Sequence, residues 1–402
     1  MNEKPELLAP AGNLQKLKLA FYFGADAVYV GGKAFSLRTF ADNFTDEELK
    51  EGIEYAHARG KKVYVAANIF ARNGDFTRLS EYFFYLQTIG ADAVLISDPG
   101  AFRVCRKAAP CLPVHLSTQA NTTNAQSAAF WKDLGVSRVV LARELSLKEI
   151  GEIHAENPDL ELEAFVHGAM CVSYSGRCLL SDYLDGRSSN RGACVQACRY
   201  RYSVRTEEKR GDEWFPVEED EKGAYFMNSK DLNMSAHLKE LAEAGVCSFK
   251  IEGRMKSEYY LATVVNAYRR LLDGGEISLL GEELKCAAHR AYTTAYALGN
   301  NGDTIACDNS QTKGTCEFIA VVTDCRQGRV YAEMRGRFYE GDVLEILSPS
   351  EQFRKAFTVA DLKDGAGNSC TDAKRVQDIY SFACPYPLQK GDILRRRKEP
   401  LA

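Results

Sequence analysis

Four of the thirteen cysteines lie within one polar stretch rich in glycine, serine and arginine, residues 167–199. They are Cys171, Cys178, Cys194 and Cys198. Thiolates are soft ligands that select zinc or iron–sulfur clusters, and four thiolates complete either kind of site. The spacing differs from the C-x2-C pattern of common structural zinc sites, which favours an iron–sulfur cluster over zinc. The alternative is that these are buried cysteines of a packed insertion.

A second group of candidates is the charged segment KIEGRMK, residues 250–256. Because side chains alternate along a strand, Lys250, Glu252 and Arg254 share one face. Buried charges need partners, so the group fits a structural salt-bridge layer and a site for an anionic ligand equally well. We take the three residues as candidate catalytic groups. Arg143, which follows an earlier strand-like run, carries the same two interpretations.

Three further polar residues complete the candidate site. His167 ends a strand-like run and adjoins the cysteines, so it is a candidate catalytic histidine. Gln119 follows another such run, and Lys230 lies just before a predicted helix. With Arg143, these two are candidates for holding a cofactor or cosubstrate. Asp231, beside Lys230, is expected to cap that helix.

Other features exclude several classes of protein. The sequence has no HExxH helix, GxSxG elbow, P-loop or strand-linked GxGxxG, which removes the usual signs of metalloproteases, serine hydrolases, kinases and dinucleotide-binding enzymes. The N-terminus does not resemble a signal peptide, and no apolar run approaches about 18 residues. We therefore expect a cytoplasmic protein with no membrane partner. Cysteines outside the stretch, such as Cys105 and Cys286, are interpreted as small core residues.

The net charge of −4 gives no overall attraction to nucleic acid. Contact with RNA would therefore need a local basic patch. The densest basic run is residues 395–398, RRRK. It fits a solvated terminus or a contact with phosphates.

The elements that must position these residues are strand-like runs that alternate with helical patterns, which is typical of βα units around a parallel sheet. Their number is that of a closed (β/α)8 barrel. The expected strands cover residues 6–9, 27–31, 62–68, 93–97, 114–117, 138–142, 160–166 and 248–252. Loops after the strands of such a barrel form one face, and enzymes of this architecture work there. The cysteine stretch follows the seventh strand and therefore shares that face with the charged candidates.

The predicted fold class is α/β: a TIM-type (β/α)8 barrel with an insertion after strand 7 and a small C-terminal all-β barrel domain. The barrel domain covers residues 1–280. Its insertion, residues 168–230, far exceeds the usual loop of about 2 to 6 residues. A helix and linker cover 281–315, and alternating apolar runs predict the β-barrel domain over 316–402.

Six motifs, in order along the chain, resemble those of the bacterial peptidase family U32. They are ELLAPAGNLQKLKLAFYFGADAVYVGG, LSTQANTTN, FVHGAMCVSYSGRCLLSDY, NRGACVQACR, MNSKDL and SFKIEGRMKS. The resemblance spans residues 6–275, and the C-terminal β domain is similar to that of longer members. It implies a TIM-barrel-like core. It also implies that Cys171, Cys178 and Cys194 match positions that hold a 4Fe-4S cluster in members that assist ubiquinone hydroxylation. Asn233 stands where a cysteine often follows NSKDL, so the fourth ligand is open and Cys198 is our choice.

The resemblance implies two kinds of activity. Some members have been described as collagenase-like peptidases, which are hydrolases. Others take part in oxygen-independent hydroxylation of tRNA wobble uridine to 5-hydroxyuridine, of a 23S rRNA cytidine, or of ubiquinone precursors. The length and β domain of this chain are most similar to the tRNA 5-hydroxyuridine proteins, for which prephenate is the implied source of the hydroxyl group.

We therefore predict an RNA-modification enzyme whose partners are tRNA and prephenate, a small anionic metabolite. The alternatives are a peptidase in which Cys171 or Cys178 with His167 supplies nucleophile and base, 23S rRNA hydroxylation, and a non-enzymatic binding subunit. Zinc is the alternative metal. A homo- or hetero-oligomer is compatible with each alternative.

Overall fold

The structure is a computed structural model that describes residues 4–36, 42–171, 173–174, 177–200, 228–299, 304–305 and 312–398. The chain divides into two compact units. The first comprises Met1–Leu17, Asp26–Met255 and Arg290–Thr312, and the second comprises Lys18–Ala25, Lys256–His289 and Lys313–Ala402. The predicted division at residues 281 and 316 stays a prediction. Residues 201–227 of the predicted insertion, and 300–303 and 306–311 of the predicted linker, lie outside the described residues.

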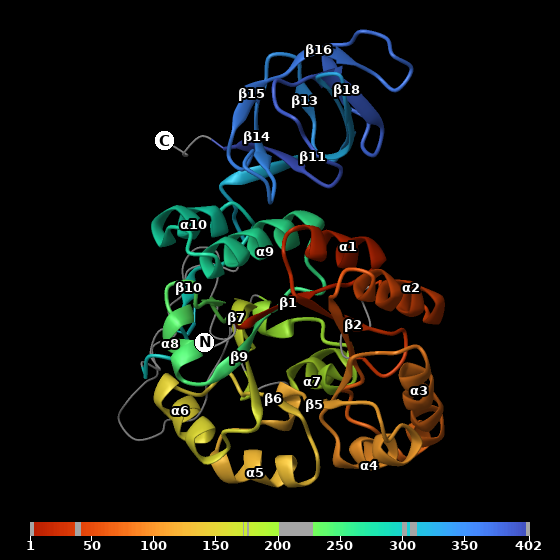
Figure 1. The fold of residues 1–402 in the computed structure, drawn as a ribbon, viewed down its shortest axis with the longest axis vertical. Helices are drawn as coiled ribbons and strands as arrows, with labels where there is room; N and C mark the ends of the chain where they lie inside the picture. The colour runs from red at the N-terminus through yellow and green to blue at the C-terminus, as the bar shows by residue number, and fades with distance from the viewer. Residues whose placement is uncertain are drawn as a thin grey trace. The chain divides into compact units, whose positions relative to one another are not determined.

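Eight parallel strands of the described chain close into the barrel of the first unit (Figure 1). Each strand pairs with the next, and β9 pairs with both β7 and β1, which completes the ring. The strands are β1 (Glu6–Pro10), β2 (Ala27–Gly31), β3 (Lys62–Ala66), β4 (Ala93–Ile96), β5 (Val114–Leu116), β6 (Arg138–Val140), β7 (Glu161–Ala169) and β9 (Val246–Ile251). This confirms the predicted TIM-type barrel.

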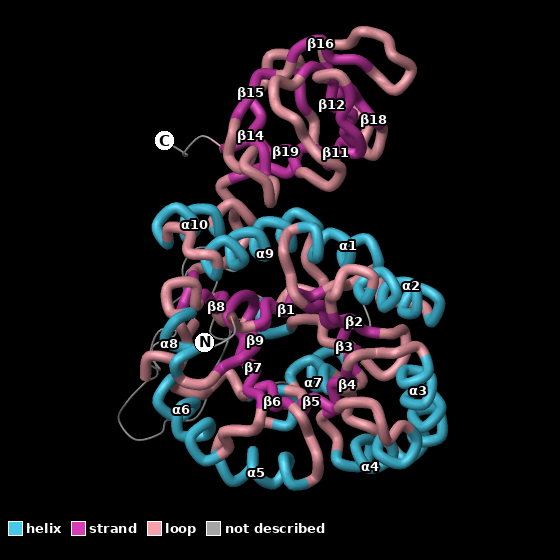
Figure 2. The backbone as a smooth tube through the Cα atoms, in the orientation of Figure 1, coloured by secondary structure: helices cyan, strands magenta, loops and turns pink. Residues whose placement is uncertain are grey.

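Helices surround the ring of strands in the first unit (Figure 2). They include α2 (Asp46–His57), α3 (Phe76–Thr88), α4 (Pro99–Ala108), α5 (Ala125–Asp133), α6 (Leu147–Glu156) and α8 (Leu238–Glu243), while α1 (Leu14–Tyr22) runs from the first unit into the second. A capping box explains where α2 begins. The Glu48 backbone N–H donates to Thr45 Oγ1 at 3.1 Å, and the Thr45 backbone N–H donates to the Glu48 carboxylate at 2.8 Å. Every residue of β2 and of β4 is buried, as expected for strands covered on both faces.

The segments after β7 depart from the regular barrel pattern. Described elements here are α7 (Leu180–Asp185), the 3-10 turns η4 (Ser189–Arg191) and η5 (Ala197–Arg199), and the short strands β8 (Asp231–Asn233) and β10 (Tyr292–Thr293). β8 pairs antiparallel with the end of β7, and β10 pairs with β8. The expectation that Asp231 caps a helix is wrong. It is buried in β8, where its carboxylate accepts hydrogen bonds from the backbone N–H and Nε of Arg290, both at 3.1 Å.

The second unit contains helices α9 (Glu258–Leu272) and α10 (Ile277–Leu284) and an antiparallel β domain with its own apolar core. Its main sheet has the order β15-β14-β19-β11-β12-β18-β16. The strands are β11 (Cys316–Arg326), β12 (Arg329–Met334), β13 (Phe338–Tyr339), β14 (Val343–Leu347), β15 (Ala356–Thr358), β16 (Ala360–Lys363), β17 (Asp372–Ala373), β18 (Ile379–Ala383) and β19 (Ile393–Arg397). This nearly closed barrel confirms the predicted C-terminal β domain.

The basic run 395–398 is not a free solvated terminus, because most of it belongs to strand β19; the alternative of a phosphate contact stays a prediction. Arg395 lies in β19 and is fully buried between two carboxylates. Its Nη2 is 2.8 Å from Glu283 Oε2, and its Nε is 2.8 Å from Glu345 Oε1. Within the described ranges, no helix is both long and apolar enough to span a lipid bilayer.

Candidate functional site

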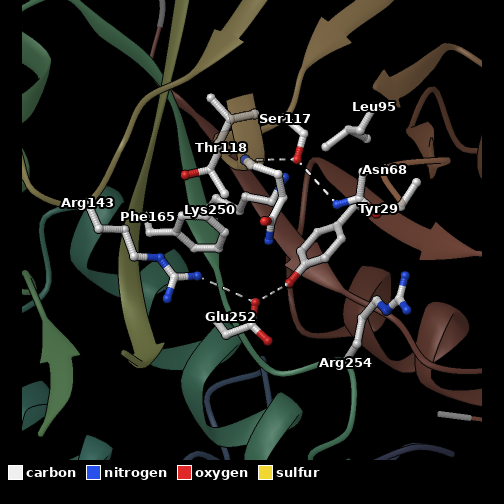
Figure 3. Close-up of a pocket in the computed structure, with 13 residues that line it drawn as sticks. Tyr29, Asn68, Leu95, Ser117, Thr118, Arg143, Phe165, Lys250, Glu252 and Arg254 are labelled. Carbon is white, nitrogen blue, oxygen red and sulfur yellow. Dashed lines mark hydrogen bonds and ion pairs between the residues drawn. The ribbon is translucent and has the colours of Figure 1, made fainter. Parts of the chain in front are cut away.

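A polar cavity lies at the carboxyl-terminal ends of the barrel strands (Figure 3). The polar and aromatic residues that line it are Tyr29, Asn68, Ser117, Thr118, Gln119, Arg143, Phe165, Lys250, Glu252 and Arg254. The structure therefore brings together five predicted site residues, Gln119, Arg143, Lys250, Glu252 and Arg254. They come from the carboxyl-terminal ends of three strands, β5, β6 and β9, as expected for a site on a barrel of this kind.

Lys250 is almost fully buried and belongs to an ion pair inside the barrel. Its Nζ lies 2.7 Å from Glu163 Oε1 and 4.3 Å from the centre of the Tyr29 ring. Burial lowers the pKa of Lys250, and the adjacent Glu163 opposes that change. Burial raises the pKa of Glu163, but the charges of Lys250 and Arg138 outweigh burial and bring that pKa below its usual value. The pair therefore places a basic amino group, held by a carboxylate, in the wall of the cavity.

A network of further polar groups holds this pair. Arg138 Nη1 lies 3.2 Å from Glu163 Oε2 and 2.7 Å from Glu6 Oε1, and Ser248 Oγ is 2.9 Å from the same Glu6 oxygen. The predicted salt-bridge layer therefore exists, and Lys250 belongs both to it and to the cavity lining. Neighbouring His115 has its pKa lowered to about 3 by burial and, next, by Arg138, so it is neutral.

Arg143 and Glu252 form the second charged pair of the cavity, joined by a dashed line in Figure 3. Arg143 Nη2 is 3.7 Å from Glu252 Oε2. The guanidinium is fixed from two sides, because Nη1 donates to the Ala169 carbonyl at 2.8 Å and the group stacks 3.8 Å from the centre of the Phe165 ring. The Tyr29 hydroxyl donates to the Ile251 carbonyl at 3.0 Å and lies 3.5 Å from Glu252 Oε2.

Buried polar atoms of the lining that have no hydrogen-bond partner among the described residues include Arg143 Nε, a donor, and Gln119 Oε1, an acceptor. Buried polar groups are nearly always satisfied in folded proteins, so each unpaired atom needs an explanation. A ligand with a hydrogen-bond acceptor and a donor would satisfy both.

Arg254 is held by side chains of the segment that follows β2. Its Nη1 donates to Ser36 Oγ at 2.7 Å and its Nη2 to Asn43 Oδ1 at 3.4 Å. A Cβ at Gly31 would collide with this guanidinium, so glycine is required there for the close approach. Arg254 therefore links β2, the loop after it and the end of β9.

Two predicted site residues, His167 and Lys230, are not among the described residues that line the cavity. His167 is buried on β7, with its ring 5.4 Å from that of Tyr292, and its carbonyl accepts a hydrogen bond from the Glu252 backbone at 2.8 Å. Its backbone therefore helps to place Glu252. The Lys230 backbone N–H donates to the Thr304 carbonyl at 2.9 Å. The catalytic and binding roles predicted for these two residues stay predictions.

The cysteine stretch is tied to the same face of the barrel. The Phe70 backbone, in the loop after β3, donates to the Asn190 carbonyl at 3.1 Å. Arg191 Nη1 donates to the Phe70 carbonyl at 2.8 Å and pairs with Asp75 Oδ2 at 2.9 Å. The predicted placement of the stretch beside the strand ends is therefore what the structure shows.

Cys198 lies within electrostatic range of the other three thiols of this stretch. Burial raises the pKa of Cys198, Arg199 opposes it, and the other three cysteines raise it further. Backbone N–H groups of Leu180 and Gln196 donate to the sulfurs of Cys178 and Cys194, each at 3.4 Å. Across the described ranges, no three His, Cys, Asp or Glu residues converge closely enough to hold a metal ion. Four cysteine sulfurs are the donor type that an iron–sulfur cluster requires. In the described structure, however, these sulfurs do not lie close enough together to coordinate one metal centre.

Asn233, which stands where the family motif often has a cysteine, has a local structural role. It pairs with His167 across β7 and β8, and its Oδ1 accepts a hydrogen bond from the Ser235 backbone at 3.0 Å. Its side chain thus stabilises the turn after β8. This leaves Cys198 as the predicted fourth thiolate.

Comparisons with known proteins agree on one family. The sequence profile of peptidase family U32 matches residues 12–306, and that of the peptidase family U32 C-terminal domain matches residues 314–395. A Bacillus subtilis protein named tRNA hydroxylation protein P1 is 39% identical over 99% of this chain and 96% of its own length. A Helicobacter pylori tRNA hydroxylation protein P is 45% identical over 81% of this chain and 80% of its own. An Escherichia coli 23S rRNA 5-hydroxycytidine synthase is 37% identical over 67% of this chain but only 39% of its own length.

Proposed function

This chain belongs to peptidase family U32, and from that premise we propose that it takes part in hydroxylating the wobble uridine of tRNA to 5-hydroxyuridine without molecular oxygen. The observation that carries the proposal is a near full-length match: the chain and the Bacillus subtilis tRNA hydroxylation protein align over 99% and 96% of their lengths. Both units are thus shared with a protein of that name. The cytoplasmic location expected from the sequence is part of the proposal, because tRNA is the substrate.

We propose that the cavity binds a small anionic cosubstrate, with prephenate as the expected one. Arg143 and Arg254 supply guanidinium groups to the lining, and Lys250 supplies an amino group. Guanidinium groups bind carboxylates through charge-assisted hydrogen bonds. The unpaired acceptor Gln119 Oε1 would receive a hydrogen bond from a hydroxyl group of the ligand. A metabolite with carboxylate and hydroxyl groups therefore suits the lining.

Within this cavity, Glu252 is the candidate for moving a proton. Its Oε2 lies 3.5 Å from the Tyr29 hydroxyl, and Arg143 lies 3.7 Å away on another side. A carboxylate held between a hydroxyl donor and a guanidinium can accept a proton from a bound ligand and return it. Lys250, fixed by Glu163, would stabilise negative charge on that ligand.

We further propose that Cys171, Cys178, Cys194 and Cys198 hold a 4Fe-4S cluster, with zinc as the alternative. Two of the sulfurs already receive backbone N–H hydrogen bonds, an interaction that tunes the potential of iron–sulfur clusters. When bound, the cluster would supply electron transfer beside the cavity. The backbone donors to Cys178 and Cys194 would favour the thiolate forms that ligation requires, and Arg199 opposes the rise in the pKa of Cys198 that burial causes.

The experiment that tests the function is mass spectrometry of tRNA nucleosides from a strain that lacks this gene. We expect 5-hydroxyuridine derivatives at the wobble position to disappear and an expressed copy of the protein to restore them. Unchanged wobble nucleosides in the deletion strain would contradict the proposal. Nucleosides from the 23S rRNA of purified ribosomes would be measured in the same way. Loss of a 5-hydroxycytidine alone would indicate the 23S rRNA alternative instead.

The structure lends less support to the peptidase alternative. It needs Cys171 or Cys178 as nucleophile and His167 as base. His167 is only 1% exposed and packs beside Tyr292, as is typical of a structural histidine. Gelatin cleavage that is lost in a Cys171→Ala variant would support a peptidase. A stable complex with a second protein, without any change in RNA, would support a binding subunit.

A further inference from the structure

Two cysteines of the second unit, far from the cysteine stretch in sequence, are neighbours. Cys286 follows α10 and Cys316 begins β11, and both are buried free thiols. The backbones just before them are joined, because the Thr315 N–H donates to the Lys285 carbonyl at 3.0 Å. Arg397 pairs with Cys316 across β11 and β19, and its Nη1 lies 3.7 Å from the sulfur of Cys286, so contacts from both sides bring the two thiols together. The sequence favoured isolated core cysteines, and this pairing was not predicted.

Charged groups surround the pair on several sides. The sulfur of Cys286 accepts hydrogen bonds from Arg397 Nη1 and from Thr315 Oγ1, each at 3.7 Å. Arg395 also acts on both thiols, and its positive charge is shared with the carboxylates of Glu283 and Glu345. A lone buried thiol in apolar surroundings would have none of these donors.

These contacts make one thiol of the pair easier to ionise. The neighbouring Cys286 thiol lowers the pKa of Cys316; burial opposes this change, and Arg395 and Arg397 support it. The Cys316 thiol, together with burial, raises the pKa of Cys286. Cys316 is therefore the thiol of the pair that ionises first, and a thiolate beside a thiol is the arrangement that forms a disulfide.

We propose that Cys286 and Cys316 form a redox-active dithiol that a hydroperoxide oxidises to a disulfide. The thiolate sulfur attacks one peroxide oxygen and breaks the O–O bond, which gives a sulfenic acid and hydroxide. The second thiol then attacks the sulfenic sulfur and releases water. In total, two thiols and one hydrogen peroxide give one disulfide and two waters, so the sulfurs lose two electrons and the peroxide gains them.

The disulfide would close the chain between 286 and 316 into a loop. That loop contains β10, and both of its ends lie in the second unit. A cross-link of this kind removes freedom from the unfolded chain and so stabilises the unit. This inference is independent of the tRNA reaction, because neither cysteine lines the barrel cavity or belongs to the cysteine stretch.

The test is disulfide mapping of the full-length protein, purified without oxygen and treated with a small excess of hydrogen peroxide. Remaining thiols are alkylated before proteolysis, and peptides are identified by mass spectrometry. We expect a peptide that joins Cys286 to Cys316, two hydrogens lighter than the sum of its parts, and its loss after reduction. Buried Cys105 serves as the internal control and should stay alkylatable after unfolding.

Matched variants give a second measurement. Oxidation should raise the thermal unfolding temperature of the second unit in the native protein and in Cys105→Ser, but not in Cys286→Ser or Cys316→Ser. Mapping of the native protein does not depend on whether the variants fold. Recovery of both cysteines as alkylated thiols after peroxide treatment, or as separate sulfinic acids, would overturn the proposal.

Discussion

The cavity and the cysteine stretch lie on the same face of the barrel but are built differently. Cavity groups stand on strands or directly after them, and buried contacts fix them, as the network around Glu163 does for Lys250. Of the cysteines, Cys198 stands in the 3-10 turn η5, whereas Cys171, Cys178 and Cys194 lie in irregular segments; Cys171 is exposed and the other three are half-buried. A site on strands is organised before its ligand arrives, whereas a thiolate site on turns gains its final geometry from the metal.

The largest expected difference between the two regions concerns stability. Glu163→Gln removes a fully buried charge and leaves Lys250 without its partner, so we expect it to lower the free energy of unfolding by about 3–5 kcal/mol. Glu161→Gln is the matched control, because Glu161 also pairs with Arg138 but its side chain is 53% exposed. Its loss should be about 0–1 kcal/mol. Urea unfolding measures both, and equal effects would contradict a preorganised cavity.

The next effect is on activity at the cavity. Arg143→Ala removes the guanidinium that Phe165 and Ala169 fix beside Glu252. Charged hydrogen bonds contribute about 1.5–3 kcal/mol. We therefore expect 5-hydroxyuridine formation to fall by about 10- to 100-fold. Arg103→Ala, at an exposed position on α4, is the control. Quantitative nucleoside analysis of tRNA from complemented strains measures the loss. Full activity of Arg143→Ala would remove it from the site.

A smaller effect concerns acid sensitivity inside the barrel. Burial lowers the pKa of His115 to about 3 from 6.5, so below about pH 6.5 the unfolded chain takes up a proton that the folded chain does not. Stability from this group is therefore present above that pH and is lost as the pH falls towards about 3. In His115→Asn, the free energy of unfolding should decrease less than in the native protein when the pH is lowered from about 6.5 to about 5. An unchanged slope would show that His115 titrates normally.

The smallest expected change in stability is at the cysteine stretch. Cys194→Ser should lower iron content sharply after anaerobic reconstitution, while the unfolding free energy of the metal-free protein changes by about 0.5 kcal/mol or less. Exposed Cys111, outside the stretch, provides the control Cys111→Ser, which should keep its iron. A large loss of stability in metal-free Cys194→Ser would mean that the cysteines are core residues. That result would remove the contrast between the two regions.

The barrel and part of its site could be predicted because they depend on local signals. Apolar runs that alternate with helical patterns define the strands, and the common face of the strand ends brings Gln119, Arg143, Lys250, Glu252 and Arg254 together. Nothing in the sequence near these residues indicates Tyr29 or Phe165 as lining residues, because aromatic residues in strands usually belong to the core.

The buried network could not be predicted, because closure of the barrel creates it. Glu6, Arg138 and Glu163 lie on three strands and meet only through the register in which β1 pairs with β9 and β6 with β7. Arg395 was misinterpreted for the same reason, since its partners Glu283 and Glu345 lie far away in the sequence. Single charges on strands carry no local sign of such partners.

The most direct test of the account is whether both regions serve one reaction on tRNA. A deletion strain would be complemented with the native protein, Glu252→Gln, Cys194→Ser or Cys111→Ser, and wobble nucleosides would be measured at matched protein levels. We predict 5-hydroxyuridine derivatives with the native protein and Cys111→Ser, and their absence with Glu252→Gln and with Cys194→Ser. Normal 5-hydroxyuridine with Glu252→Gln or Cys194→Ser would contradict the account.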